Sequence, residues 1–241
     1  IHRNQYNARN LEYYSEDPIL TGAMGANVYR QAVAHGMVVA GKHFAFNDQE
    51  TNRDGVAVFL GEQAARENEL RGFQIAFRDG NANSLMTAFN RLGCTHVGAS
   101  KGLMNGILRG EWGFKGYVIT DSVKSAKYFL PSECLVAGND RMLGGSNNVS
   151  VWGYTEDEVA DDLVIQAGVR ESYHRYLYTY VNSSVMNGIS EKTDATGAIA
   201  WWILALQLAM GISFVLFIVF LVMFILKYRK EQKNDEPEKI Q

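Results

Sequence analysis

The sequence predicts an α/β fold followed by one membrane-spanning helix. Short apolar runs bounded by glycine, asparagine or aspartate alternate with longer stretches of helical periodicity. That alternation is typical of parallel strands joined by crossover helices. Near the C-terminus, residues 198–226 contain no Asp, Glu, Lys or Arg, and residues 203–226 are almost entirely apolar. These two patterns divide the chain into a globular part and a lipid-facing part.

The globular part is predicted to be a portion of a (β/α)8 barrel of the TIM type. Polar residues follow three of the apolar runs, as in barrels where strand ends build one functional face. The predicted strands are too few to close a barrel of eight, so we expect a partial barrel. The predicted strands are 37–42, 85–89, 117–120 and, as the weakest, 134–137, and the predicted helices are 23–34, 62–77, 101–109 and an interrupted 155–181.

The apolar run near the C-terminus is long enough to cross a bilayer, since about 20 apolar residues span the hydrocarbon core. Trp201 and Trp202 flank one end and Lys227, Arg229 and Lys230 flank the other. Aromatic rings favour the headgroup zone and basic residues stay in the cytoplasm. The sequence therefore predicts a single-pass cell-membrane protein with an extracellular globular part and a cytoplasmic C-terminus. The alternative interpretation is a buried core helix. The predicted segments are a barrel portion at 1–190, a linker at 191–198, a transmembrane helix at 199–226 and a tail at 227–241.

Composition excludes several functional classes. A chain with 47% hydrophobic and 20% charged residues is not a disordered chain, and a net charge of −3 gives no basic footprint for nucleic acid. The 2 cysteines exclude a disulfide-dense scaffold and leave one disulfide possible, and the 5 histidines lack metal-ligand spacing. Residues 36–42 match a phosphate-loop spacing, but they form a predicted strand followed by His43 where Ser or Thr is needed. We therefore expect no metal and no cofactor.

Four polar residues are expected to share the functional face: Lys42, His43, Asn90 and Asp121. A carboxylate at the end of a strand suits a nucleophile, a base or a ligand-holding group, and Asp121 could equally be the N-cap of the next helix. Lys42 and His43 suit contacts with hydroxyl groups or anions, or could pair with Asp48 and Glu50. Two glycosylation sequons, at 148–150 and 182–184, have meaning only in a secretory pathway that glycosylates them.

Five ordered blocks resemble the motifs of glycoside hydrolase family 3, the β-glucosidase and β-xylosidase type. They are spread in order over residues 9–140 of the globular part, and their order makes the resemblance far more specific than any one block. The blocks are RNLEYYSEDP at 9–18, KHFAFNDQE at 42–50, LMTAFN at 85–90, RGEWGFKGYVITD at 109–121 and AGND at 137–140.

The resemblance implies a retaining glycosidase in which Asp121 is the catalytic nucleophile and forms a glycosyl-enzyme intermediate. It also implies that Arg9, Lys42 and His43 hydrogen-bond the hydroxyl groups of the sugar. Phe89 belongs to the same substrate-binding set, but it stands where the family commonly has a tyrosine whose hydroxyl can orient the nucleophile.

The family's acid/base residue usually comes from a second, α/β sandwich domain, and the first barrel strands precede this region in relatives. We therefore interpret the chain as the C-terminal piece of a domain-permuted, membrane-tethered β-glucosidase-like enzyme, inactive by itself. The expected partners are a carbohydrate substrate, the lipid bilayer, and the missing N-terminal barrel strands and sandwich domain. The alternative is an inactive, membrane-anchored protein with a sugar-binding or structural role.

Overall fold

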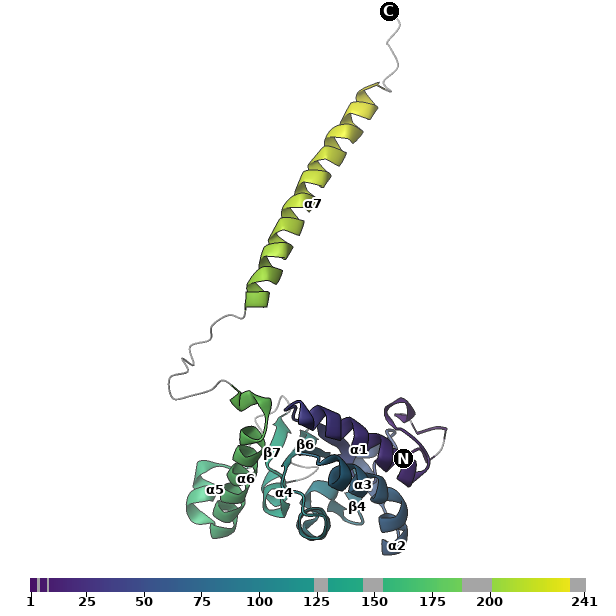
Figure 1. The fold of residues 1–241 in the computed structure, drawn as a ribbon, viewed down its shortest axis with the longest axis vertical. Coiled ribbons are helices and arrows are strands. Elements are labelled where there is room, and N and C mark those ends of the chain that lie inside the picture. Colours follow the sequence, from purple (N-terminus) through teal and green to yellow (C-terminus); the bar gives the residue numbers. More distant parts are fainter. Residues whose placement is uncertain (4, 8, 124–129, 145–153, 188–200, 235–241) are drawn as a thin grey trace, which may run out of the picture. The chain divides into compact units, whose positions relative to one another are not determined.

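The computed structural model describes residues 1–3, 5–7, 9–123, 130–144, 154–187 and 201–234 (Figure 1). Two compact units follow one another along the chain, Ile1–Ile189 and Ser190–Gln241. The predicted linker at 191–198 and the tail beyond residue 234 lie outside the described residues, as does the sequon at 148–150. The sequon asparagine Asn182 lies at the exposed end of a helix, where its side-chain amide donates to the carbonyl of Tyr178.

The first unit is built on a parallel sheet of four strands in the order β1-β3-β6-β7. Register pairs are Gly41 with Leu85, Leu85 with Val118, and Ile119 with Arg141. Neighbours in the sheet follow one another along the chain and are joined by helical segments, so the α/β class is confirmed. The strands are β1 Ala40–Phe44, β3 Ser84–Thr87, β6 Tyr117–Val123 and β7 Arg141–Gly144.

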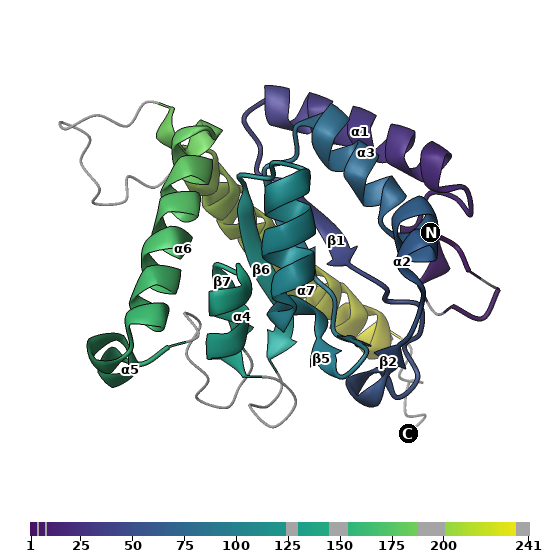
Figure 2. The same ribbon diagram turned by 90° about the horizontal axis from the view of Figure 1, so that it is seen from below.

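Helices α1 and α3 pack against each other beside β1, and α4 and α6 pack beside β7 (Figure 2). Helix α1 starts at Asp17, whose carboxylate accepts from the amides of Ile19 and Leu20, and Pro18 takes the first helical position. The long helices are α1 Pro18–Ala34, α3 Arg71–Gly80, the π-helical η5 Gly102–Glu111 and α6 Leu163–Val181; shorter ones are α2 Glu62–Ala64, η3 Ala65–Glu69, α4 Pro131–Ala137 and α5 Glu156–Asp161.

A small second sheet follows the carboxyl ends of β1 and β3 along the chain. Its three strands have the order β2-β4-β5, with β2 and β4 parallel and β4 and β5 antiparallel. The strands are β2 Ala57–Val58, β4 Arg91–Leu92 and β5 Thr95–His96, and single 3-10 turns occur at η1 Asn10–Glu12, η2 Arg53–Gly55, η4 Val97–Ala99 and η6 Ser184–Met186.

The core lies between the sheet and the helices that cover it. Phe44 from β1, Leu85 from β3 and Val118 from β6 are fully buried, and they belong to one apolar cluster with Phe77 of α3 and Leu108 of η5. Alternate residues of each strand point toward these helices, which leaves the others to face the opposite side. The register of β1 shifts between Gly41 and Phe44, so the consecutive residues Lys42 and His43 both line one cavity.

Prediction of a strand at 134–137 is wrong, because these residues end helix α4. Pro131 occupies the first helical turn, where its missing N–H costs no hydrogen bond, and Gly138 ends the helix with a φ of 118° that favours glycine. The fourth strand follows at β7 instead. Both cysteines are free, Cys94 exposed and Cys134 buried, so they form no disulfide with each other.

Asp140 fixes the positions of three elements around the start of β7. Its side chain is fully buried and accepts from the Val118 amide at 2.7 Å, Arg109 Nη2 at 3.2 Å and Arg175 Nε at 2.7 Å. Ser172 Oγ donates to its carbonyl at 2.8 Å. The contacts join β6, η5 and α6, so the last of the five sequence blocks has a structural role.

The second unit contains one long helix, α7 Trp201–Asn234. Its segment Trp201–Lys230 contains an 18-residue stretch with a mean hydropathy of 3.0, and it is long and apolar enough to cross a membrane, by length and composition. The predicted span at 199–226 falls within this region except for its first two residues, which lie outside the described part.

Candidate active site

Asp121 lies inside β6, two residues before the strand ends, and its side chain is largely buried. The alternative role as a helix N-cap is therefore wrong, since the chain continues as a strand to Val123. The Ser122 amide donates to Oδ1 at 2.6 Å. Oδ2 receives no hydrogen bond from the part of the chain that the structure describes. The backbone thus holds one oxygen, while the other accepts no hydrogen bond from the described residues.

Two ionisable side chains lie near Asp121 Oδ2, the cationic Arg53 and the imidazole of His43. Arg53 Nη1 lies 3.7 Å from Asp121 Oδ2, and His43 Nε2 lies 3.8 Å away. Arg53 Nη1 also lies 3.1 Å from Glu50 Oε2, and its guanidinium lies 4.8 Å above the ring centre of Phe89. Arg53 was not among the predicted site residues, and the available signal was its position three residues after the KHFAFNDQE block.

His43 is a neutral imidazole at physiological pH. Burial lowers its pKa to about 4, with Asp121 opposing that shift and Arg9 and Lys42 adding to it. Arg9 Nη1 lies 3.2 Å from His43 Nε2, and a guanidinium can only donate. Nε2 must therefore be the unprotonated nitrogen, which places the proton on Nδ1. In this tautomer His43 gives no hydrogen bond from Nε2 to Asp121.

Arg9 and Lys42 are joined by Glu12, a residue the sequence analysis did not single out. Arg9 Nε and Nη2 donate to the Glu12 carboxylate at 2.7–3.0 Å, and Lys42 Nζ lies 3.2 Å from Glu12 Oε2. The alternative pairing of Lys42 and His43 with Asp48 and Glu50 is not observed among the ion pairs of the described residues. Asp48 pairs with Arg3, and Glu50 with Arg53.

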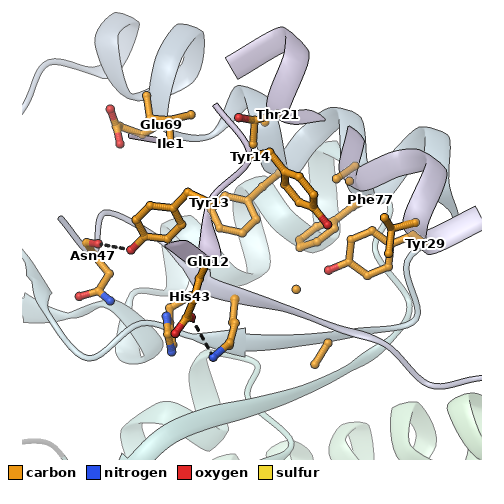
Figure 3. A pocket seen from close by; sticks show the side chains of 18 of the residues that line it. Ile1, Glu12, Tyr13, Tyr14, Thr21, Tyr29, His43, Asn47, Glu69 and Phe77 are labelled. Atoms are coloured by element: carbon orange, nitrogen blue, oxygen red, sulfur yellow. Dashed lines mark hydrogen bonds and ion pairs between the residues drawn. The ribbon is translucent and has the colours of Figure 1, made fainter. Parts of the chain in front are cut away.

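A cavity of about 260 Å³ opens beside β1 (Figure 3). Glu12, Lys42 and His43 line its polar end, and the dashed line from Glu12 in Figure 3 marks the ion pair with Lys42. Tyr13 Oη donates to the Asn47 carbonyl at 3.2 Å, which fixes the N-terminal segment to the loop after β1. Helices α1 and α3 supply the apolar end, with Tyr29 and Phe77 among its lining residues.

The predicted site residues therefore gather at one end of the sheet. Arg9, His43 and Asp121 form a chain of contacts, Lys42 joins it through Glu12, and Phe89 joins it through Arg53. The peptide bonds Lys42–His43 and Phe44–Ala45 are cis. Asn90, the fourth polar residue expected at this face, is buried and its Nδ2 contacts the Arg91 carbonyl at 3.4 Å. No group of three or more His, Cys, Asp or Glu able to hold a metal occurs in the described ranges.

The family model for the glycosyl hydrolase family 3 N terminal domain matches residues 1–177. The chain belongs to glycoside hydrolase family 3. A β-glucosidase of Ruminococcus albus is 43% identical over 121 residues, covering 50% of this chain and 13% of that protein. The probable β-glucosidase K of Emericella nidulans is 38% identical over 145 residues, covering 60% of this chain and 17% of that protein.

Solved structures agree with this family assignment. β-Glucosidase 3B from Thermotoga neapolitana in complex with glucose is 34% identical with a TM-score of 0.70, over 77% of this chain and 26% of that one. The Kluyveromyces marxianus β-glucosidase in complex with glucose is 27% identical with a TM-score of 0.67, over 80% and 23%. These family 3 neighbours are α/β barrel domains, so the four-stranded sheet corresponds to part of that architecture. The chain spans only 13–17% of the length of the two curated relatives named.

Proposed function

We propose that this chain carries the nucleophile and part of the sugar-binding site of a retaining β-glucosidase-like enzyme. The observation that supports the proposal best is Asp121 Oδ2, which lies 3.7 Å from Arg53 and 3.8 Å from His43 and receives no hydrogen bond from the described residues. A carboxylate oxygen held in this way is ready to attack an electrophilic carbon.

In the proposed reaction, Arg9, Lys42 and His43 bind hydroxyl groups of the glycone. Neutral His43 offers Nδ1–H as a donor, and the two cations offer charge-assisted hydrogen bonds. Asp121 Oδ2 forms a bond to the anomeric carbon as the bond to the leaving oxygen breaks. A carboxylic acid from elsewhere in the polypeptide protonates that oxygen, about 5–5.5 Å from the nucleophile in retaining enzymes, and water then releases the sugar.

Phe89 modifies this site rather than disabling it. A tyrosine at the position would offer a hydroxyl to the nucleophile, whereas Phe89 offers a ring face that the Arg53 guanidinium covers at 4.8 Å. Arg53 in turn provides positive charge 3.7 Å from Asp121 Oδ2. We infer that Arg53 supplies the electrostatic support for an ionised nucleophile.

We also propose that α7 anchors the enzyme at the cell surface. Its segment Trp201–Lys230 meets the length and hydropathy of a bilayer span, with tryptophans at one end and basic residues at the other. This arrangement favours an extracellular globular part and a cytoplasmic tail. The chain covers only 13–17% of the length of the named relatives, so we propose that turnover needs more of the polypeptide than this chain.

Hydrolysis of an aryl β-glucoside by the full-length natural polypeptide tests the proposal. Asp121→Asn is expected to abolish turnover while sugar binding persists, whereas Asp157→Asn, on the exposed helix α5, is the matched control and should leave turnover unchanged. A 2-fluoro glycoside should add its glycosyl mass to the peptide that contains Asp121. Absence of turnover in the wild type, with sugar affinity unchanged by Asp121→Asn, would instead favour the inactive sugar-binding protein.

A further inference from the structure

Glu12 lies between the two cations that the proposed function assigns to sugar binding. Arg9 is the N-cap of the 3-10 turn η1 and Glu12 is its last residue. A 3-10 helix has three residues per turn, so side chains three apart lie directly above one another. Arg9 Nε donates to Oε1 at 3.0 Å, and Nη2 donates to Oε1 at 2.8 Å and to Oε2 at 2.7 Å. The guanidinium is therefore held as a planar fork.

The same carboxylate reaches a second cation from a distant part of the chain. Lys42 belongs to β1, and its Nζ lies 3.2 Å from Glu12 Oε2. The Lys42 and Glu12 side chains are 43% and 33% exposed, so both remain accessible at the polar end of the cavity (Figure 3). Glu12 therefore connects the N-terminal segment to the strand that carries Lys42 and His43.

Arg9 also lies within ion-pair distance of a second carboxylate. Arg9 Nη1 lies 3.9 Å from Glu50 Oε1, which already accepts from Arg53 Nη1 at 3.2 Å. Without Glu12, Arg9 would lose its nearest anion and turn toward Glu50. That movement would draw Arg9 from His43 Nε2 and would weaken the hold of Glu50 on Arg53.

The charges of the side chains around Glu12 balance one another. Arg9, Lys42 and Arg53 carry three positive charges, and Glu12, Glu50 and Asp121 carry three negative charges when ionised. Hydrogen bonds from Arg9 and Lys42 lower the pKa of Glu12, so it stays ionised at neutral pH. Loss of the Glu12 carboxylate would leave the three cations with one positive charge in excess, and Arg9 and Lys42 would then repel each other.

We propose that Glu12 is a positioning residue for glycone recognition: it binds Arg9 and Lys42 together and sets where both cations meet the sugar hydroxyl groups. The inference rests on the proposed function of Arg9 and Lys42. Glu12 itself needs no contact with the reacting atoms. Its effect should appear mainly in substrate binding, because both cations contact the sugar in the ground state as well as in the transition state.

The test compares the steady-state kinetics of two variants of the full-length polypeptide, Glu12→Gln and Glu111→Gln. Glu111 is a matched control because its carboxylate also accepts two bonds from one arginine, Arg66 at 2.7 and 2.9 Å, on an exposed surface. Glu12→Gln is expected to lower kcat/KM for an aryl β-glucoside at least tenfold, mostly through KM, and to raise the inhibition constant of glucose. Glu111→Gln should change neither more than twofold.

Deoxy substrates separate positioning from a general structural effect. Aryl β-glucosides lacking the 3-, 4- or 6-hydroxyl are compared in wild type and Glu12→Gln. At least one deoxy substrate should show a much smaller penalty, because the hydroxyl that Arg9 or Lys42 binds is already absent. An equal penalty for every substrate would overturn the positioning role.

Failure of the proposed function and failure of this inference give different results. A wild type without turnover and without glucose binding refutes the proposed function and this inference with it. An active wild type in which Glu12→Gln behaves like Glu111→Gln refutes only this inference. If Glu12→Gln does not fold, Glu12→Asp serves instead. This variant keeps the charge and the Arg9 contact but shortens the reach to Lys42. An intermediate rise in KM is expected, and an unchanged KM would contradict the proposal.

Discussion

Replacement of Asp140 by asparagine is expected to destabilise the first unit strongly, because the carboxylate neutralises two largely buried arginines. Arg109 and Arg175 side chains are only 12% and 13% exposed, and Asp140 is 0% exposed. Asparagine has nearly the same shape but no charge, and its NH₂ group would face a donor at Val118, Arg109 or Arg175. Removing one partner of a buried ion pair costs about 3–5 kcal/mol, since a buried charge is left uncompensated.

Urea unfolding of the detergent-solubilised chain, followed by tryptophan fluorescence, to which buried Trp112 contributes, measures this cost. With a slope of about 2 kcal/mol/M, the loss corresponds to a midpoint lower by about 1.5–2.5 M. Glu111→Gln is the control, because it removes a carboxylate from the exposed pair with Arg66, and such pairs contribute about 0–1 kcal/mol. Equal midpoint shifts for the two variants would refute the role assigned to Asp140.

Two further predictions concern acid stability and the apolar helix. Burial lowers the pKa of both His43 and His96 to about 4, against about 6.5 in an unfolded chain, so only the unfolded state gains these protons between those values. The free energy of unfolding should therefore fall as the pH drops from about 6.5 to 4, by up to about 3 kcal/mol per histidine. Urea titrations at several pH values should show a weaker pH dependence of this free energy for His96→Gln. An unchanged pH dependence in that variant would contradict the prediction. Phe217→Arg should reduce the carbonate-resistant membrane fraction, since a central arginine costs about 2.5–3.5 kcal/mol on insertion, whereas Tyr228→Arg should not.

The fold could be predicted where one periodicity was unambiguous. β3 and β6 overlap the predicted strands because each contains a short apolar run next to turn residues. β1 overlaps its predicted strand only at residues 40–42, since the apolar residues 37–39 precede it and the strand continues through Lys42 and His43. The segment 134–137 is equally apolar and short, and periodicity alone cannot separate a buried strand from a buried helical turn. Pro131 and Gly138 were the residues that could have decided it, since proline favours the first helical turn and glycine the position just after the last.

The candidate site could be predicted only as far as residue type and motif allow. Asp121, His43 and Arg9 come together because parallel strands end at one edge and because the N-terminal segment crosses the end of β1. Glu12 and Arg53 were missed for a physical reason. Their pairs with Arg9 and Glu50 are local, but each is tied to the site by a residue 30 or more positions away, and no local pattern records a tertiary ion pair. Lys42 shows the same limit, since the carboxylates nearest in sequence are not its partners.

Phe89, which stands where the family commonly has a tyrosine, still contacts a residue of the candidate site. A phenyl ring cannot donate a hydrogen bond, yet its face attracts a guanidinium with about 0.5–2 kcal/mol, more when solvent is excluded. Arg53 is only 18% exposed, it covers this face at 4.8 Å, and Glu50 holds its other side at 3.1 Å. The ring therefore helps to fix a positive charge near Asp121, where a hydroxyl would have offered a directed hydrogen bond. A positive charge favours an ionised carboxylate but does not direct its oxygens as a hydrogen bond does. Among the described residues, the hydrogen bond that orients the Asp121 carboxylate is the one from the Ser122 amide to Oδ1.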